Sequence, residues 1–226
     1  MKYPEIEFNK EKALELSDFR DMDYYAVKNF HIPIELMMEN AGLQLASLIS
    51  KLASKNQTIQ IGIGNGNNGG GGLVAARRLA AWGYSVHLDI FTEITKELPL
   101  LQLKRAIMFG AKQGKLDNPD FWIDAYLGFS QHLPLGDDLY EIIDRANNSK
   151  AIKISLDIPT GFIGDINTPY FKADKILTLA APKKILFDLS NTELFVADLG
   201  IPRQVYEMFE TEFLPFNKGS IIKLKK

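Results

Sequence analysis

The sequence predicts an α/β protein with a doubly wound, mostly parallel sheet and helices on both faces. Short β-rich segments alternate with helical segments along most of the chain, which is typical of such sheets. A burst of glycines at 64–72 joins the first clear strand to a helix. With 226 residues, 46% hydrophobic and 24% charged, the composition is that of a globular protein. We expect one domain over 1–226, with its core at about 10–210.

Two helices open the chain. Apolar residues recur every three or four positions over 10–29, which predicts an amphipathic helix. Pro33 interrupts it, and a second helix follows over about 34–52. The second helix carries more apolar residues than one sheet face needs, so we expect a homodimer in which a partner buries some of them. Packing within the chain is the alternative; the residues concerned are Ile34, Leu36, Met37 and Met38.

Strands and helices then alternate. We expect strands at 58–63, 85–91, 121–127 and 151–156, and helices at 73–82, 98–109 and 138–147. Gly83 and Gly110 end the first two of these helices. Later strands are expected at 175–179, 184–187 and 193–196, with a short helix over 202–209. The basic segment at 217–226 is expected to be a solvated tail.

Charge and cysteine content exclude several classes of function. Lys plus Arg number 26 and Asp plus Glu number 28, so the formal charge is −2 and no nucleic-acid partner is expected. The absence of cysteine excludes disulfides, thiol nucleophiles and thiolate zinc sites. No apolar run reaches the roughly 18 residues of a membrane span, and the first residues are charged, so we expect a cytoplasmic protein without a membrane partner.

Three loops follow predicted strands and are the places to look for chemistry. They comprise 64–72, 124–130 and 157–161. In open α/β sheets, ligands bind outside the carboxyl ends of the strands. We therefore expect these three loops to converge at one edge of the sheet.

The first loop has the spacing of a dinucleotide-binding turn. Gly64, Gly66 and Gly69 fit the pattern, and Asp89 lies 20 residues beyond Gly69. Glycines let backbone amides approach an anion at the start of a helix. We expect a phosphate or pyrophosphate group on the amides of 67–72, the alternative being a merely flexible turn.

The other two loops each carry an aspartate at a strand end. Asp157 directly follows an apolar strand, where a carboxylate must be paired, hydrogen-bonded or shifted in pKa, which is the usual setting of a general acid or base. A fully hydrogen-bonded structural aspartate is the alternative. Asp124 is either a cap or loop ion pair, or, together with Thr160 and an Asn amide oxygen, part of an all-oxygen site for a hard cation.

Several short motifs, in order, resemble one known family. They are Glu39-Asn40-Ala41-Gly42, the segment from Asn67 to Arg77, Asp124-Ala125, the segment from Asp157 to Gly161, the segment from Leu179 to Lys184, and the segment from Phe195 to Pro202. Over about residues 15–210 the chain is similar to the YjeF N-terminal domain family, the NAD(P)H-hydrate epimerases.

The resemblance implies a fold, an activity and a set of site residues. The fold is a Rossmann-like three-layer α/β/α sandwich, commonly a homodimer, which interconverts the R and S forms of hydrated NADH or NADPH. A separate dehydratase, a possible functional partner, then repairs the S form. The resemblance places K⁺ on Asn68, Asp124 and Thr160 and the acid/base role on Asp157. The implied substrate-binding residues are Asn67, Asn68, Gly69, Gly70, Gly71, Gly128, Phe129, Ser130, Gln131, His132, Leu133, Pro134 and Asp157.

The chain departs from this family at two places. Gly71 stands where the family's loop has Asp, so a carboxylate at the helix start is missing, and the loop 128–134 is less glycine-rich at its end. Two other functions therefore stay open. One is a non-catalytic nucleotide-binding or scaffold domain of the same fold, and the other is an ordinary NAD dehydrogenase that uses the glycine turn and Asp89.

Overall fold

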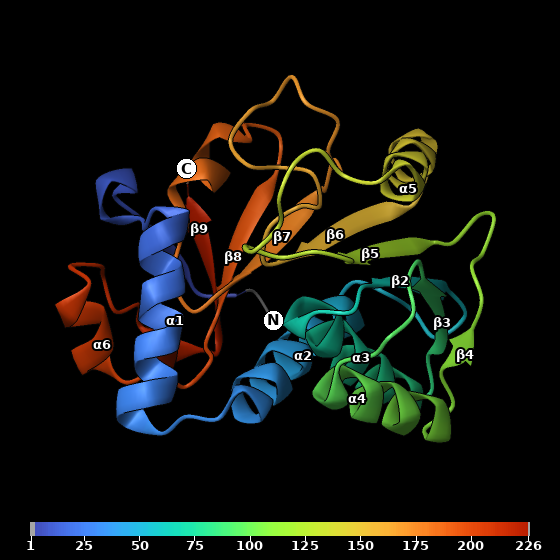
Figure 1. The fold of residues 1–226 in the computed structure, drawn as a ribbon, viewed down its shortest axis with the longest axis horizontal. Coiled ribbons are helices and arrows are strands. Elements are labelled where there is room, and N and C mark those ends of the chain that lie inside the picture. The colour runs from blue at the N-terminus through green and yellow to red at the C-terminus, as the bar shows by residue number, and fades with distance from the viewer. Residues whose placement is uncertain (1–2, 226) are drawn as a thin grey trace.

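The computed structural model describes residues 3–225, whose core is a nine-stranded sheet with helices on both faces (Figure 1). The strand order is β1-β9-β8-β7-β6-β5-β2-β3-β4, and neighbouring strands are parallel except β8 and β9. This confirms the predicted α/β class. The strands are β1 (Glu5–Glu7), β2 (Thr58–Ile63), β3 (Ser85–Ile90), β4 (Lys112–Gln113), β5 (Phe121–Ala125), β6 (Ile152–Leu156), β7 (Lys175–Leu179), β8 (Glu193–Ala197) and β9 (Ile221–Lys225).

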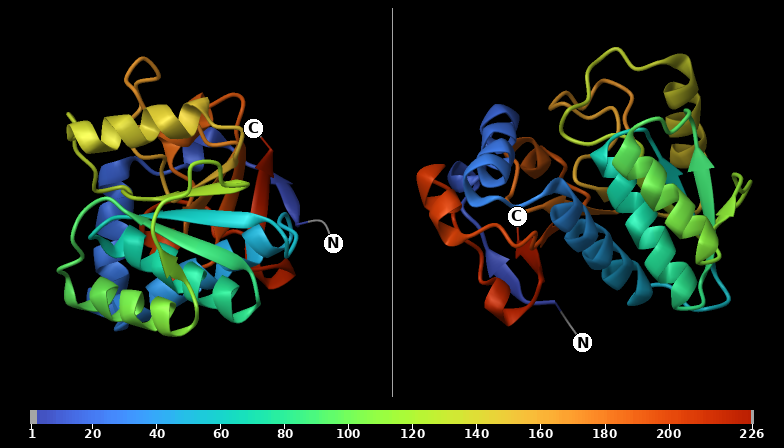
Figure 2. Two further views of the ribbon diagram at one scale, coloured as in Figure 1. Left: turned by 90° about the vertical axis from the view of Figure 1, so that its right-hand side faces the viewer. Right: turned by 60° about the horizontal axis from the view of Figure 1, so that its bottom comes forward.

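Each face of the sheet has its own helical layer and core. Helices α2, α3 and α4 cover one face, and α1, α5 and α6 cover the other (Figure 2). Short 3₁₀ helices occupy Lys10–Lys12, Lys184–Asp188 and Phe216–Lys218. The longer helices are α1 (Leu16–Phe30), α2 (Ile34–Ser50), α3 (Asn67–Ala81), α4 (Glu97–Met108), α5 (Asp137–Asn148) and α6 (Arg203–Met208).

The order of the strands reverses between β2 and β5. The chain runs outward from β2 through β3 to β4, returns to the other side of β2 as β5, and continues through β6, β7 and β8. Ile63 of β2 lies opposite Ala125 of β5, so these two strands end side by side. Such a reversal opens a crevice at the carboxyl ends of the strands, which is where ligands bind in open α/β sheets.

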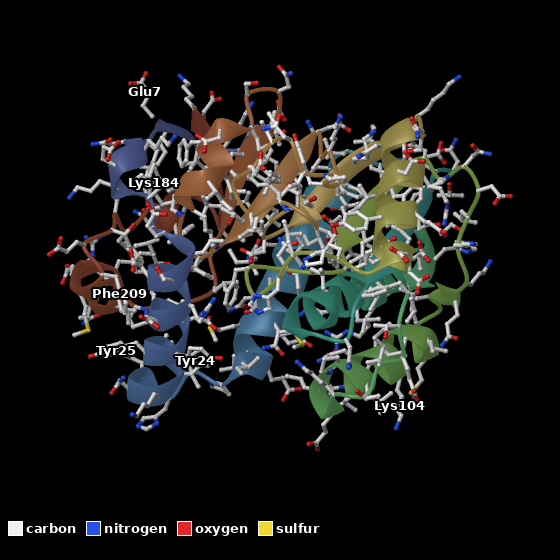
Figure 3. The ribbon with its side chains drawn as sticks, turned by 45° about the horizontal axis from the view of Figure 1, so that its top comes forward. Glu7, Tyr24, Tyr25, Lys104, Lys184 and Phe209 are labelled. Carbon is white, nitrogen blue, oxygen red and sulfur yellow. The ribbon has the colours of Figure 1, made fainter. Side chains whose placement is uncertain are left out.

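Helix α1 packs on the sheet face that carries α6 rather than standing free. Phe19, Met22 and Ala26 on one stripe of α1 are buried in the core of that face. At the edge of this core Tyr25 meets Phe209 edge to face, with ring centroids 6.0 Å apart; both residues are labelled in Figure 3. No helix of the described chain combines the length and the apolar character needed to cross a membrane.

The glycine-rich segment is part of helix α3, which begins at Asn67 rather than at residue 73 as predicted. The glycines allow α3 to pack closely on its neighbours. A Cβ at Gly72 would lie 2.7 Å from the Cβ of Ala125, and a Cβ at Gly42 of α2 would lie 2.4 Å from that of Val74. Close packing, not flexibility, therefore explains the glycine burst.

Three other expectations were wrong. The first helix begins at Leu16, after the 3₁₀ turn, rather than at residue 10. Residues 184–188 form a 3₁₀ helix rather than a strand, because β6 and β8 already flank β7 and leave no place beside it. The basic tail contains strand β9, in which Ile221, Ile222 and Leu224 are buried against β8, so its lysines are the exposed half of an alternating pattern.

Candidate functional site

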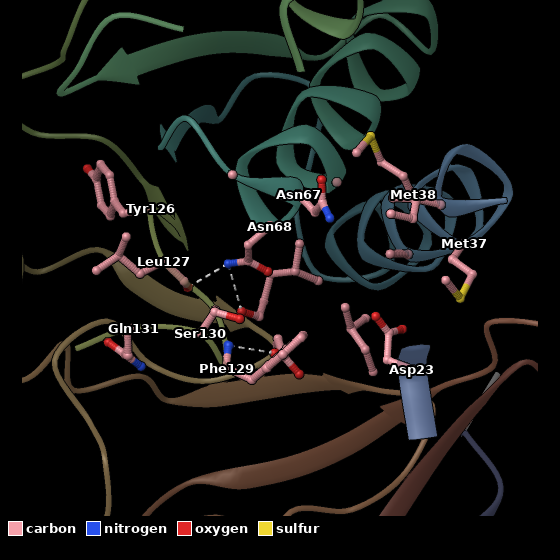
Figure 4. A pocket seen from close by; sticks show the side chains of 18 of the residues that line it. Asp23, Met37, Met38, Asn67, Asn68, Tyr126, Leu127, Phe129, Ser130 and Gln131 are labelled. Atoms are coloured by element: carbon pink, nitrogen blue, oxygen red, sulfur yellow. Dashed lines mark hydrogen bonds between the residues drawn. The ribbon is translucent and has the colours of Figure 1, made fainter. Parts of the chain in front are cut away.

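A cavity of about 590 Å³ opens at the reversal point, where helices α1, α2 and α3 meet the loops after β2, β5 and β6 (Figure 4). Its wall is largely apolar, with Phe19, Val27 and Met38 among the lining residues. Asp23 from α1 and Asn67 and Asn68 from the start of α3 face the same space (Figure 4). A largely apolar cavity with a few polar groups is the usual form of a small-molecule site.

The structure brings together most of the predicted binding residues. Those that line the cavity are Asn67, Asn68, Gly71, Gly128, Phe129, Ser130, Gln131 and Asp157. Gly69 and Gly70 lie behind the wall, where a Cβ would lie 2.0 Å from the Gly64 carbonyl oxygen and 2.5 Å from the Met38 Cε respectively. The end of the second loop also lies outside the lining, and comprises His132, Leu133 and Pro134.

The amides predicted to hold an anion are only partly free. The Gly70 N–H donates to the Gly66 carbonyl at 3.0 Å, so the helical hydrogen-bond ladder of α3 starts there. Amides beyond Gly70 are used within the helix, and only those before it can face a ligand. The amides available to the expected anion are therefore limited to the first turn of α3, at about 66–69.

Asn68 joins the three predicted loops. Its Nδ2 donates to the Leu127 carbonyl at 2.6 Å and to the Leu156 carbonyl at 3.2 Å, so α3 is tied to the ends of β5 and β6. Its Oδ1 is buried and has no hydrogen-bond donor within the described chain. A buried acceptor without a partner is costly, so this oxygen is suited to a positively polarised ligand.

Asp124 is a fully buried carboxylate held by hydrogen bonds. One oxygen accepts from the Thr160 hydroxyl at 2.6 Å, and the other accepts from the Thr160 amide and the Ser155 hydroxyl, each at 2.8 Å. Burial raises the pKa of Asp124 to about 6, and these hydrogen bonds oppose the rise. The Thr160 hydroxyl also accepts from the Leu127 amide at 3.2 Å, which links this cluster to the loop that Asn68 holds.

Asp157 ends β6 with a left-handed backbone, at φ 69°. Its side chain is 1% exposed and faces the cavity. One oxygen accepts from the Phe129 amide at 3.1 Å, as the dashed line in Figure 4 marks. The other lies 2.9 Å from the Lys183 Nζ and 3.4 Å from the Thr178 hydroxyl. The carboxylate is therefore fixed by donors from three different segments.

Lys183 is a wholly buried cation that was not predicted as a site residue from the sequence. Its Nζ donates to the Leu179 carbonyl at 2.6 Å and lies 3.4 Å from the centre of the Phe19 ring. Burial lowers the pKa of Lys183, while the charges of Asp157 and Asp23 oppose that shift. The signal in the sequence was its place in the motif from Leu179 to Lys184, which carries part of the family resemblance.

Asp23 is the second carboxylate of the cavity and was also missed. It follows Phe19 by one helical turn, so both side chains face the buried Lys183. Burial raises the pKa of Asp23 to about 6, with Lys183 lowering it and Asp157 raising it further. A carboxylate on the apolar stripe of a predicted helix was the signal that could have found it.

Two amide side chains hold the loops around the cavity in place. Gln131 donates to the carbonyls of Pro159 and Phe162 and accepts from the Gly161 amide at 2.7 Å, so it latches two of the predicted loops together. Asn40 of α2 donates to the Leu199 carbonyl at 3.0 Å, beside the cavity. Amides of this kind hold loops in place without adding charge.

The structure places the residues behind two other expectations. Asp89 lies outside the cavity lining, and its carboxylate accepts from the Tyr126 hydroxyl at 2.8 Å, so the acidic residue that a dehydrogenase needs is engaged elsewhere. Met37 and Met38 are buried within the chain, so of the residues invoked for a dimer only Leu36 is largely exposed, at 56%.

Among the described residues that line the cavity, Lys96 is the sole cationic one.

Comparisons with known proteins agree with this architecture. The family model for the YjeF-related protein N-terminus matches residues 34–185. The NAD(P)H-hydrate epimerase of Rhodopirellula baltica is 35% identical over 209 residues, covering 84% of this chain and 85% of that protein. The bifunctional NAD(P)H-hydrate repair enzyme Nnr of Thermofilum pendens is 27% identical, over 87% of this chain and 41% of the enzyme.

A solved structure shares the fold. The crystal structure of the yeast protein YNL200c superimposes with a TM-score of 0.85 at 22% identity, covering 94% of this chain and all of that one. With the family model matching 152 of 226 residues (185 − 34 + 1), the chain belongs to the family of YjeF-related protein N-terminal domains.

Proposed function

We propose that this protein is an NAD(P)H-hydrate epimerase, which interconverts the R and S forms of hydrated NADH and NADPH. The observation that carries the proposal is the convergence of three sequence-distant loops on one cavity, with the buried carboxylate of Asp157 facing it. The name of the relative in Rhodopirellula baltica, which aligns with most of this chain, supports the same activity.

The chemistry requires a hydroxyl group to leave C6 of the nicotinamide ring and to return on the opposite face. The C6–O bond breaks with its electron pair on oxygen, and the ring nitrogen shares the positive charge that remains. A fixed carboxylate beside this cation stabilises it electrostatically and assists proton transfer. Asp157 lines the cavity and accepts hydrogen bonds from the Phe129 amide and the Thr178 hydroxyl, which supports this role.

A potassium ion fits the residues that the resemblance implies. Asn68 Oδ1 is a buried acceptor without a donor, and Asp124 is a buried carboxylate with no Lys or Arg paired to it among residues 3–225. The hydrogen bonds through Leu127 and Thr160 bring the two into one connected cluster. The ion would be held by Asn68, Asp124 and Thr160, and it would supply positive charge that fixes the loop ends.

One of the relatives also bears on a functional partner. The Nnr relative is named as bifunctional, and this chain aligns with 41% of its length, which supports a functional link to a dehydratase that acts on the S form. A homodimer and a cytoplasmic location stay predictions. The exposed Tyr24 and Leu36, at 64% and 56%, are the apolar residues of α1 and α2 most open to a partner chain.

The direct test is an epimerisation assay. Purified protein is given R-form hydrated NADH, and a dehydratase specific for the S form converts the product to NADH, read at its absorbance band. We expect turnover, with Asp157→Asn lowering kcat by about 10²–10⁴-fold. Asp117→Asn, an exposed control far from the cavity lining, should keep the wild-type rate. Absence of wild-type turnover with either cofactor would contradict the proposal.

The scaffold alternative is favoured by one observation, the absence of a carboxylate at Gly71. A Cβ there would lie 3.1 Å from a Leu156 methyl group and 3.7 Å from the Ala41 Cβ, so the site accepts a side chain after a small shift. Gly71→Asp therefore tests the alternative. If the wild type is inactive and this variant gains turnover, the chain is a binding domain derived from an epimerase.

A further inference from the structure

The proton that the reaction needs must come from a group that holds one. Epimerisation by loss of the hydroxyl requires a proton donor, because hydroxide is a poor leaving group. Both oxygens of Asp157 already accept hydrogen bonds, from the Phe129 amide on one side and from Lys183 and Thr178 on the other. The Asp157 carboxylate is therefore arranged as an acceptor of protons and a source of negative charge, not as the donor.

Asp23 is the other acidic group at the cavity, and it is arranged differently. It lines the cavity, and within the described chain no hydrogen bond or ion pair engages its carboxylate. Its oxygens are therefore left for a ligand or for water. Asp23 stands on α1 and Asp157 at the end of β6, so two carboxylates reach the cavity from different elements.

One ammonium group serves both carboxylates. The Lys183 Nζ contacts Asp157 at 2.9 Å and is fully buried, and the charges of Lys183 and Asp23 act on each other. With both aspartates ionised the cluster carries −2 + 1 = −1, and with Asp23 protonated it is neutral. Desolvation favours the neutral cluster, so a proton is held more readily on Asp23 than on an exposed aspartate.

Resting on the proposed epimerase function, we propose that Asp23 is a further catalytic residue, the carboxylic acid that protonates the departing C6 hydroxyl. The C6–O bond breaks, its electron pair leaves on the oxygen, and water is released. Asp157 balances the cation, and Lys183 is the positioning residue that holds Asp157. Water then adds to the opposite face of C6 and gives a proton to the Asp157 carboxylate, which passes it to solvent, and Asp23 regains a proton from solvent, so the protein returns to its starting state.

This assignment predicts a pH profile. A donor acts only while protonated, so kcat/KM of the wild type should fall as pH rises past about 6, the value to which burial raises the pKa of Asp23. The charged groups that act on this carboxylate are Lys183, which lowers its pKa, and Asp157, which raises it. Asp124 has a similar pKa but is fully buried, so the variants must separate the two.

The experiment compares Asp23→Asn, Asp23→Glu and Asp21→Asn in the coupled assay between pH 5 and 8. Asp21 is an exposed aspartate on the same helix and serves as the matched control. We expect Asp23→Asn to lose about 10²–10⁴-fold in kcat together with the alkaline fall. Asp23→Glu should recover part of the rate, and Asp21→Asn should match the wild type. Binding of NADPH, followed by its fluorescence, should be nearly unchanged in all three.

An NMR measurement, which needs no turnover, distinguishes a folding defect from a loss of catalysis. With ¹³C-labelled aspartate, NMR of the wild type should show a carboxyl group titrating near pH 6 that is missing from the folded Asp23→Asn variant. An active wild type with full rate in Asp23→Asn would overturn the assignment of Asp23 alone. A wild type that turns over neither cofactor would overturn the proposed function, and the role of Asp23 with it.

Discussion

Removing one partner of the ion pair between Lys183 and Asp157 should lower both stability and rate. The Lys183 and Asp157 side chains are 0% and 2% exposed, and their charged atoms lie 2.9 Å apart. Lys183→Met keeps most of the apolar stem but leaves a buried carboxylate without its counter-ion and the Leu179 carbonyl without its donor. Breaking a buried pair by removing one partner costs about 3–5 kcal/mol.

The expected loss of unfolding free energy sets the change in Tm that an experiment must resolve. For a domain of this size each kcal/mol lowers Tm by about 2–4 °C, so Lys183→Met should melt about 6–20 °C below the wild type. The free energy of unfolding would be measured by urea denaturation followed by circular dichroism, with the slope m used to check that the transition stays two-state.

A double-mutant cycle separates the pair from its surroundings. In Lys183→Met/Asp157→Asn the two charges disappear together, so this double variant should be more stable than the sum of the single losses predicts, by about 0.5–3 kcal/mol. A loss below about 1 kcal/mol for Lys183→Met, with additive single variants, would refute the view that buried charge pairing holds Asp157 in place.

Three further perturbations test neighbouring features. Asp23→Asn should be about 1–2 kcal/mol more stable than the wild type at pH 7 and equal to it near pH 4 in urea denaturation. The reason is that burial raises the pKa of Asp23 to about 6 in the folded protein, so the wild type loses folding stability as the pH rises through that value. Each unit of that shift is worth about 1.36 kcal/mol before a discount for partial exposure. Asp124→Asn should lower the free energy of unfolding by about 1–3 kcal/mol, because an amide nitrogen cannot accept the hydrogen bonds that one carboxylate oxygen now receives. Replacing KCl by choline chloride should lower the Tm of the wild type but not that of this variant. Gly72→Ala should cost about 1–3 kcal/mol by overpacking against Ala125, while Gly136→Ala, with no atom within 4 Å of its added Cβ, should be nearly neutral in thermal melts.

The alternation of the sequence was enough to predict the sheet and most of its strands. Strands β2 and β7 have the predicted bounds, because each is a short β-rich run between turn residues. The end strand β9 was missed because its alternating lysines look like a solvated tail, although the apolar half of the pattern is buried against β8. Pairing with a distant strand is a tertiary effect that local composition does not show.

The difference between local sequence pattern and tertiary packing also applies to the site residues. Asp124 and Asp157 were predicted as site residues because each lies at the end of a strand, and parallel strands bring their carboxyl ends to one edge, whereas Asn68 was predicted from the resemblance. Asp23 and Lys183 were not predicted as site residues, because Asp23 lies within a helix and Lys183 lies four residues beyond the end of β7, in a motif used only for the resemblance. Asp23 reaches the cavity only through the docking of α1, and Lys183 through the turn after β7, so their proximity depends on packing between elements.

The backbone around Lys183 shows why the cluster is rigid. Asp157 and Ala180 follow β6 and β7, and both have left-handed backbones, at φ 69° and φ 58°. This conformation costs non-glycine residues roughly 1–2 kcal/mol each, and it persists where surrounding bonds fix it. Here the Asp157 amide donates to Leu177 at 2.8 Å and the Ala180 amide to Ala197 at 2.9 Å. The two turns place the ammonium of Lys183 beside the Asp157 carboxylate before any ligand arrives. The strain and the buried charges therefore lower stability in return for a fixed arrangement of charge, which is the condition under which electrostatic stabilisation of a cation is most effective.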